Sequence, residues 1–194
     1  MGKSLIDKAI DSIFDAEWVG RRGERLCESE LRWVRLLGRK GTVLRNAYVP
    51  KRGGGTSEID VLFVTRKGVF VIESKNYSGW IFGSEGQRYW TAVQKGDRKD
   101  RFYNPVMQNA SHVKWLREFL ADGTPLFSIV AFSERCELKK VEVERGGAVI
   151  KRDRLYAAVR RIWDASPDAL SEERIADVVS RLEPLTRVDK TKGA

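Results

Sequence analysis

Apolar positions recur every three or four residues in several parts of the chain, and this spacing predicts helices. One amphipathic helix is expected at the N-terminus, within residues 1–16, where acids separate the apolar positions. A second is expected from about Glu24 to Leu37. A third should begin at Asn104-Pro105, because Asn suits the N-cap and Pro the first helical position. Two more are expected near residues 153–164 and 168–183.

Between these helices lie shorter runs rich in β-branched and aromatic residues, a pattern typical of strands. The expected strands are residues 43–49, 58–65, 68–75, 80–82, 88–94, 126–132 and 137–144. A short turn at residues 66–68 joins the second strand to the third, so these two are expected to pair. The order of elements predicts one α/β domain. We expect its core at residues 17–150 and a C-terminal helical extension with a polar tail at residues 151–194.

The charge of the chain favours a polyanionic partner. Its 194 residues include 36 Lys and Arg against 27 Asp and Glu, a formal net charge of +9. Such an excess favours nucleic acid first and an anionic membrane second. A solvated basic surface without a partner has the same composition and remains the alternative.

Features of several other protein classes are missing from the sequence. The two cysteines, Cys27 and Cys136, lie far apart, which fits a reducing compartment and argues against a zinc knuckle or a disulfide scaffold. No apolar run approaches the roughly 18 residues that a membrane span needs, and the first residues lack the apolar stretch of a signal peptide. We therefore expect a cytoplasmic protein without membrane attachment.

Two acids and a lysine interrupt strands that are otherwise apolar. Asp60 lies in the run Ile-Asp-Val-Leu-Phe-Val, and Glu73 and Lys75 follow the run Val-Phe-Val-Ile. Side chains alternate along a strand, so Glu73 and Lys75 share a face, and pairing of the two strands would bring Asp60 beside Glu73. A structural ion pair of Lys75 with either acid is one explanation. Buried ion pairs often fail to offset their desolvation, however, which favours a function for the whole cluster.

A divalent cation explains this cluster better than an ion pair does. The carboxylates of Asp60 and Glu73, with a backbone carbonyl at Ser74, are hard oxygen ligands that suit Mg²⁺ or Mn²⁺. Such a cation lowers the pKa of a bound water and neutralises charge on a phosphate. Lys75 would then orient or deprotonate the attacking water, or stabilise the developing oxyanion.

Several short motifs occur along the chain in a distinctive order. They are Gly54-Gly55-Thr56-Ser57-Glu58-Ile59-Asp60, Gly68-Val69-Phe70-Val71-Ile72-Glu73-Ser74-Lys75-Asn76-Tyr77-Ser78-Gly79, Trp90 and Asn104-Pro105-Val106-Met107-Gln108-Asn109, with Gly23-Glu24 upstream. An isolated Asp followed by Glu-x-Lys occurs by accident in many chains, but this ordered series is specific. It resembles the nuclease-related domain (NERD) family of the PD-(D/E)XK nuclease superfamily over about residues 17–135. One mild departure is Ile59, which stands where the superfamily's name has Pro.

This resemblance implies an α/β fold with a restriction-endonuclease-like αβββαβ core, a mixed central sheet and a site where the central strands diverge. It implies that Asp60 and Glu73 bind metal and that Lys75 is the catalytic lysine. Glu24 would add a metal-binding carboxylate from the first core helix, although the helix dipole also favours Glu in a first turn. Gln108 would face the site and hold a water or a phosphate oxygen.

Basic residues near the acids are candidate phosphate contacts. Lys51 and Arg52 belong to a glycine-rich loop that precedes Asp60 and would follow a phosphate backbone. No Gly-Lys-Ser/Thr follows these glycines, which excludes an NTP-binding P-loop. The basic runs at residues 95–101 and 151–161 are further candidates, or solvated faces.

Residues after the second acid are candidate substrate contacts. Asn76 and Tyr77 follow Lys75 closely, and Trp80 and Trp90 come next. The aromatic rings are candidates to stack on bases, with a place in the core of a hairpin as the alternative.

The sequence therefore predicts a metal-dependent nuclease that hydrolyses phosphodiester bonds of DNA, rather than RNA, by metal-activated water. The alternative is a non-catalytic nucleic-acid-binding module of a repair or defence assembly, but buried acids that repel phosphate favour the enzyme. His112, the only histidine, is assigned no catalytic role. The N-terminal helix is expected to pack on the domain or to mediate a homodimer.

Overall fold

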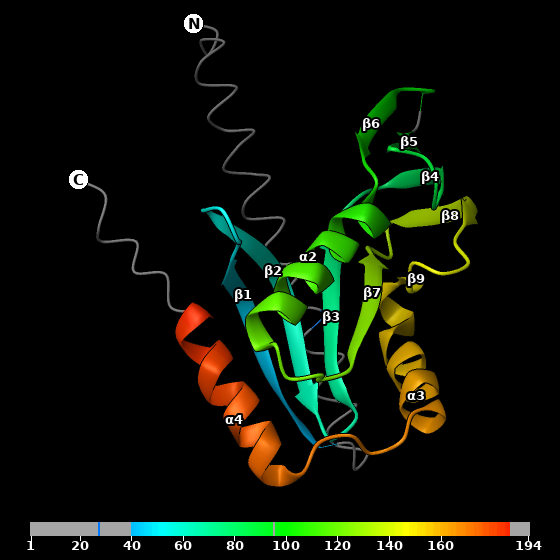
Figure 1. Cartoon of the computed structure of the whole chain (residues 1–194). Coiled ribbons are helices and arrows are strands. Elements are labelled where there is room, and N and C mark those ends of the chain that lie inside the picture. The colour runs from blue at the N-terminus through cyan, green and yellow to red at the C-terminus, as the bar shows by residue number, and fades with distance from the viewer. Residues whose placement is uncertain (1–26, 28–39, 95, 187–194) are drawn as a thin grey trace, which may run out of the picture.

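The computed structural model describes residue 27, residues 40–94 and residues 96–186 of the chain. Glu24 and the helix predicted within residues 1–16 lie outside the described residues. The elements in chain order are β1 (Gly41–Pro50), β2 (Thr56–Thr65), β3 (Gly68–Lys75), β4 (Gly79–Ser84), β5 (Tyr89–Val93), β6 (Lys99–Tyr103), α2 (Pro105–Leu120), β7 (Leu126–Phe132), β8 (Cys136–Glu142), β9 (Ala148–Lys151), η1 (Arg152–Arg154), α3 (Leu155–Ala165), α4 (Glu172–Leu182) and η2 (Glu183–Thr186) (Figure 1).

The larger sheet has five strands in the order β1-β2-β3-β7-β9 (Figure 1). The first three strands pair antiparallel, whereas β7 runs parallel to both β3 and β9. β2 and β3 are apolar over most of their length because both faces of the sheet are covered. The mixed α/β fold with C-terminal helices that the sequence predicted is confirmed.

Two apolar cores lie on opposite faces of this sheet. The core between the sheet, α2 and α4 includes Leu62, Val64, Val69, Val71, Leu116, Leu120, Val178 and Leu182. The core between the sheet and α3 includes Cys27, Val61, Phe63, Phe70, Ile72, Leu155, Val159 and Trp163. Adjacent residues of β2 and β3 thus pack in different cores, as the alternation of a strand requires. None of the helices in the described ranges is both long and apolar enough to cross a membrane.

A smaller sheet, with the order β6-β5-β4-β8, stands beyond the carboxyl ends of β3 and β7 (Figure 1). Because β4 follows β3 and β8 follows β7, the parallel pairing of β3 with β7 is repeated between β4 and β8. β6 and β9 were not predicted from the sequence. Both are short edge strands, and the alternating charges of Lys99-Asp100-Arg101 in β6 hide the apolar pattern on which strand prediction depends.

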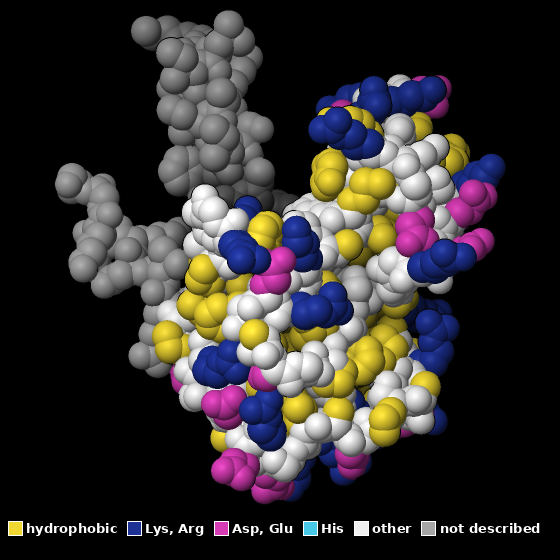
Figure 2. Space-filling view, viewed as in Figure 1, with side chains coloured by type: hydrophobic (Ala, Val, Ile, Leu, Met, Phe, Trp, Pro, Cys, Tyr) yellow, Lys and Arg dark blue, Asp and Glu magenta, His cyan; other side chains and the backbone are white. Residues whose placement is uncertain are grey.

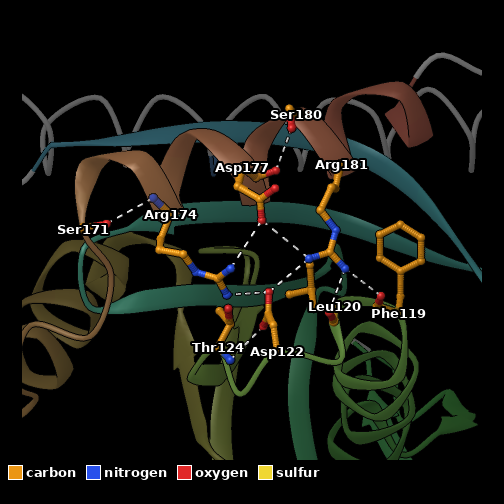
Figure 3. Close-up of polar contacts among 9 residues, drawn as sticks. All are labelled: Phe119, Leu120, Asp122, Thr124, Ser171, Arg174, Asp177, Ser180 and Arg181. Carbon is orange, nitrogen blue, oxygen red and sulfur yellow. Dashed lines mark hydrogen bonds and ion pairs between the residues drawn. The ribbon is translucent and has the colours of Figure 1, made fainter.

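Two arginines of α4 fasten this helix to the end of α2 (Figure 3). Arg174 and Arg181 form ion pairs with Asp122 at 3.0 and 3.1 Å. Arg181 also donates to the backbone carbonyls of Phe119 and Leu120, at 3.0 and 2.7 Å. These carbonyls belong to the last turn of α2, where helix acceptors lack a partner within the helix. The arginines therefore join the two helices that cover one face of the sheet.

Replacing Asp122 by asparagine should weaken this junction in a pH-dependent manner. Burial raises the pKa of the Asp122 carboxyl, but the hydrogen bond from Thr124 and the charges of Arg174 and Arg181 outweigh it and hold the pKa below its usual 3.8. The ionised carboxylate therefore stabilises the fold at neutral pH, and this contribution is lost as the pH falls through the lowered native pKa. We expect Asp122→Asn to unfold about 1 to 2 kcal/mol more easily near pH 7.

Urea denaturation of the parent and Asp122→Asn across the acidic range measures this difference. The stability difference between the parent and Asp122→Asn should shrink as the pH falls below about 4, because the Asp122 carboxylate of the parent is then being protonated and loses its charge. The matched control is Asp153→Asn, at an exposed position of η1, and it should change stability little. A stability difference between the parent and Asp122→Asn that stays constant with pH would contradict the ionic explanation.

Candidate active site

The two acids predicted to meet lie at the point where β2 and β3 separate. The antiparallel ladder of these strands ends at the pair Val61 and Ile72, and Asp60 and Glu73 come next on each strand. Beyond this pair, the backbone amide of Ser74 donates a hydrogen bond to Asp60 Oδ2 at 2.7 Å. The side chain of Asp60 thus turns toward the backbone of β3 immediately after Glu73.

A local irregularity of the first hairpin accompanies Asp60. β1 and β2 pair on both sides of Asn46 and Asp60 but not at these two residues. Asn46 has a φ of 52°, in the left-handed region that Asn tolerates better than most residues. Ile59 packs in the core under α2, whereas Val61 packs in the core under α3, so side-chain alternation changes phase at Asp60. Such breaks in a ladder re-aim a side chain, here an acid at the open end of the sheet.

Glu73 is buried between two basic side chains. Its side chain is 2% exposed, and Oε1 lies 2.7 Å from Lys75 Nζ while Oε2 lies 3.2 Å from His112 Nε2. The contact with His112 is short but poorly aligned, so neither Oε2 nor Nε2 has a well-formed hydrogen bond within the described part of the chain. Burial raises the pKa of the Glu73 carboxyl, but His112 and Lys75 outweigh this effect and lower the pKa below its usual 4.5. Glu73 is therefore ionised at neutral pH.

Lys75 connects the strand end to α2. Besides its ion pair with Glu73, Nζ donates a hydrogen bond to Gln108 Oε1 at 2.9 Å. Gln108 lies in the first turn of α2, and the side chain of Asn104 caps that turn by accepting from the amides of Val106 and Met107. The structure thus brings together Glu73, Lys75 and Gln108. An ammonium fixed by a carboxylate and an amide oxygen has its remaining N–H available for a substrate oxygen or a water.

His112 is a residue of this site that the sequence analysis missed. Its Nδ1 lies 2.7 Å from Ser57 Oγ of β2, and its Nε2 faces Glu73 of β3. It stands four residues after Gln108 on α2, so both side chains lie on the same face of the helix. This spacing was visible in the sequence, but nothing in the sequence shows which side of α2 faces β3. His112 contacts Glu73, the carboxylate that also holds Lys75.

The donor chemistry of the acids fits a divalent cation. Asp60 and Glu73 supply hard oxygens from neighbouring strands, and Glu73 Oε2 is a buried acceptor without a well-aligned donor. No three His, Cys, Asp or Glu side chains converge on a common point among the residues that the structure describes. The third acid predicted from the sequence, Glu24, lies outside those residues. The described site thus contains two of the proposed carboxylate ligands.

The loop residues predicted to bind phosphate lie at the tip of the first hairpin. Lys51 and Arg52 line a pocket of about 480 Å³ together with Pro50, and Glu118 and Phe119 of α2 complete the lining. Asn76, one residue after Lys75, accepts a hydrogen bond from Arg135 at 2.8 Å through its side-chain oxygen. Asn76 is therefore held at the junction of the larger and smaller sheets.

Two of the aromatic residues proposed as base contacts, Trp90 and Tyr77, pack in one core. Trp90 is fully buried, stacks on Phe132 with ring centroids 6.1 Å apart, and donates from Nε1 to the carbonyl of Ser84 at 3.0 Å. Its ring is therefore part of the core of the smaller sheet and has no face for a base, which corrects the assignment of Trp90 to substrate binding. Tyr77 is partly buried and stacks on Phe102 at 4.1 Å, in the same core. Successive side chains of a strand point to opposite faces of the sheet. An aromatic side chain on the buried face packs in the core and is not available to a substrate.

Comparison with known proteins places the chain in a family. Residues 19–133 match the nuclease-related domain (NERD). An uncharacterized protein of Bacillus anthracis is 38% identical over 128 residues, which are 66% of this chain and 58% of that protein. The chain thus spans less than two thirds of this relative's length. No solved structure matches the chain. Because the matched region covers more than half of the chain, the chain belongs to the NERD family.

Proposed function

We propose that this chain is a metal-dependent nuclease that hydrolyses the phosphodiester bonds of DNA. The observation that carries this proposal is the fixed ammonium of Lys75, held by Glu73 and Gln108 at the open end of β3. A lysine that served only to neutralise Glu73 would need no second anchor from another element. The anchor from α2 fixes the direction of Nζ, as a group that acts on a reacting oxygen requires.

Two acids and a backbone carbonyl are the proposed metal ligands. In this proposal Asp60, Glu73 and the carbonyl of Ser74 hold Mg²⁺ or Mn²⁺, and Glu24 is a further candidate ligand. The bound cation would supply Lewis acidity toward the phosphate and lower the pKa of a water. Glu73 stays ionised at neutral pH, since its pKa is lowered by His112 and Lys75, and is therefore ready to act as a ligand.

Lys75 acts on the reacting oxygens in this proposal. Its Nζ donates hydrogen bonds to the attacking water or to the phosphate oxygen on which negative charge develops. Gln108 keeps Nζ in place through the 2.9 Å hydrogen bond to its side-chain oxygen. The net charge of +9 attracts the nucleic-acid backbone, so that substrate binding should weaken as salt is raised.

Plasmid cleavage with the Asp60→Asn variant tests the proposal. The parent should nick supercoiled plasmid with Mg²⁺ or Mn²⁺ and lose this activity in EDTA, and Asp60→Asn should lower the rate by about 100-fold or more because a ligand charge is lost. Glu58→Gln is the matched control, since Glu58 is an exposed acid of the same strand whose oxygen accepts from Tyr48. Its rate should equal that of the parent.

The outcomes separate the proposal from its alternative. Cleavage that persists in EDTA, or that Asp60→Asn retains at the parent rate, would overturn the metal-dependent mechanism. A parent that binds DNA but cleaves none under any of these conditions would instead support the non-catalytic binding module.

A further inference from the structure

The outer face of the smaller sheet carries an unusual set of exposed side chains. On β5 the buried residues Trp90 and Ala92 alternate with Tyr89, Thr91 and Val93, which face outward. On β6 the outward positions are Lys99, Arg101 and Tyr103. The register places Tyr89 opposite Tyr103 and Thr91 opposite Arg101, so these side chains form cross-strand pairs on one face.

All of the exposed large apolar side chains in the described ranges lie on this sheet. They are Trp80, Tyr89 and Tyr103, which are 49%, 44% and 45% exposed. Trp80 pairs with Val93, and the alternation of β5 puts Val93 on the same face as Tyr89. Isolated exposed aromatics are common on proteins, but three on one face of a four-stranded sheet mark a binding surface.

Cations accompany these rings. Arg88 and Arg101 lie over the ring of Tyr89, with guanidinium carbons 5.6 and 5.1 Å from its centroid. Lys139 of β8 lies 5.4 Å from the centroid of Trp80. Figure 2 shows Lys and Arg side chains gathered over the outer strands of this sheet, at the upper right of the molecule.

A hollow of about 320 Å³ runs across the same face. Its lining includes Phe82, Tyr89, Thr91, Arg101, Lys140 and Glu142. Glu142 approaches Lys140 at 3.8 Å, and Glu137 pairs with Lys139 at 2.9 Å, so acids neutralise part of the charge contributed by β8. The charge at Arg88 and Arg101, above Tyr89, is the stronger attraction for an anion.

We propose that the face formed by Trp80, Phe82, Tyr89, Arg101 and Tyr103, here called the aromatic face, binds single-stranded nucleic acid. Aromatic rings stack on unpaired bases of any sequence, and neighbouring cations bind the phosphates. The bases of a duplex are already stacked on one another and hidden, so a duplex gains only the phosphate contacts. This chemistry favours a single strand over a duplex and over an apolar protein surface.

The size and place of the aromatic face suit a short stretch of strand. Tyr89 and Tyr103 are cross-strand partners, whereas Trp80 pairs with Val93 at the other end of β5. The rings therefore spread over about 10 Å across the strands and about 13 Å along them. This width accommodates about two or three unpaired nucleotides. β4 begins four residues after Lys75, so the smaller sheet follows the proposed catalytic lysine directly in the chain. This inference rests on the proposed function for its substrate class but concerns a separate surface.

Fluorescence anisotropy tests the aromatic face without cleavage. The probes are a labelled oligothymidylate and a labelled duplex of equal length, each titrated with the full chain in EDTA at one fixed salt concentration. We expect the parent to prefer the single strand, and Tyr89→Ala and Arg101→Ala each to weaken its binding by about 10-fold. Duplex binding should change by less than about 2-fold in Tyr89→Ala, whereas Arg101→Ala, which removes a phosphate contact, should weaken the binding of both probes. Lys114→Ala removes an exposed cation of α2 that lies over the ring of Trp115, outside the aromatic face, and is the matched control, with single-strand binding equal to the parent.

Several results would overturn this inference. One is equal affinity of the parent for both probes, and another is unchanged single-strand binding by Tyr89→Ala and Arg101→Ala. Self-association of the parent that Tyr89→Ala abolishes, with no preference for the single strand, would assign the face to a second copy of the chain. Because EDTA excludes cleavage, these results are independent of the plasmid assay. Failure of the aromatic face with retained metal-dependent nicking would leave the proposed nuclease function intact.

Discussion

Replacing Lys75 by methionine is expected to lower the rate of plasmid cleavage by at least about 100-fold, because removal of one fixed donor to a developing oxyanion has an effect of this size. Methionine retains an unbranched apolar chain of similar length and loses only the ammonium. The variant also leaves Glu73, which is 2% exposed, with His112 as its remaining basic neighbour. Initial rates of nicking with Mg²⁺ and with Mn²⁺ provide the measurement.

Two further variants make the result for Lys75 specific. Lys75→Arg retains the charge, but its planar guanidinium cannot reproduce the position of Nζ between Glu73 and Gln108, so it should also be strongly impaired. Lys40→Met removes an exposed lysine at the opposite end of the sheet and should cleave at the parent rate. Full activity of a folded Lys75→Met, as judged by circular dichroism, would remove Lys75 from the mechanism.

Replacing Asn104 by alanine is expected to lower the free energy of unfolding by about 3 kcal/mol. The buried Asn104 side chain caps α2 through the amides of Val106 and Met107, and loss of an N-cap costs about 1 kcal/mol. Its amide nitrogen also lies within 2.6 to 3.3 Å of three backbone carbonyls, those of residue 84 at the end of β4 and of residues 85 and 87 in the following loop. Alanine would remove this donor from the carbonyls of Glu85 and Gln87, whereas the carbonyl of Ser84 would still accept from Trp90 Nε1.

Equilibrium denaturation in urea measures the loss of stability in Asn104→Ala. The matched control is Ser171→Ala, since Ser171 caps α4 in an exposed position and accepts only from the amide of Arg174. Its loss should be about 1 kcal/mol or less. Equal losses of stability in Asn104→Ala and Ser171→Ala would contradict this prediction, because they would show that the contacts of Asn104 with the loop contribute nothing.

The central hairpin was predictable because its pattern is local. The runs around Asp60 and before Glu73 are apolar at nearly every position, which is typical of strands buried on both faces. Because only a short turn separates the two runs, they can pair only antiparallel. The lengths of the two apolar runs then indicate which residues lie opposite each other. The neighbouring positions of Asp60 and Glu73 at the open end of β2 and β3 therefore followed from sequence alone.

The contacts from α2 were less predictable because they are distant in sequence. Ser57 and His112 are 55 residues apart, and their contact depends on the rotation of α2 about its own axis. That rotation is set by the packing of Leu116 and Leu120 in the core rather than by any local signal. Only the resemblance to a family indicated that Gln108 faces the site, and nothing gave His112 a similar role.

The sequence also did not indicate which aromatic residue of a strand points into the core and which points to solvent. Trp90 and Tyr89 are neighbours in β5, yet the first is fully buried and the second is 44% exposed. Each face of β5 carries an aromatic residue and at least one other residue without charge, so the alternation has no clear polar side. Packing of Trp90 against Phe132 of β7, a partner 42 positions later in the chain, decides which ring points outward.

The long crossover from β3 to β7 has a consequence for synthesis of the protein. A growing chain that has left the ribosome as far as β3 already contains both acids and the lysine, but it lacks the helix that anchors the ammonium 33 residues later. It also lacks the parallel neighbour of β3, which is needed to bury that strand on its second edge. Nascent chains are therefore expected to complete the contacts around Lys75 only after α2 and β7 have been synthesised.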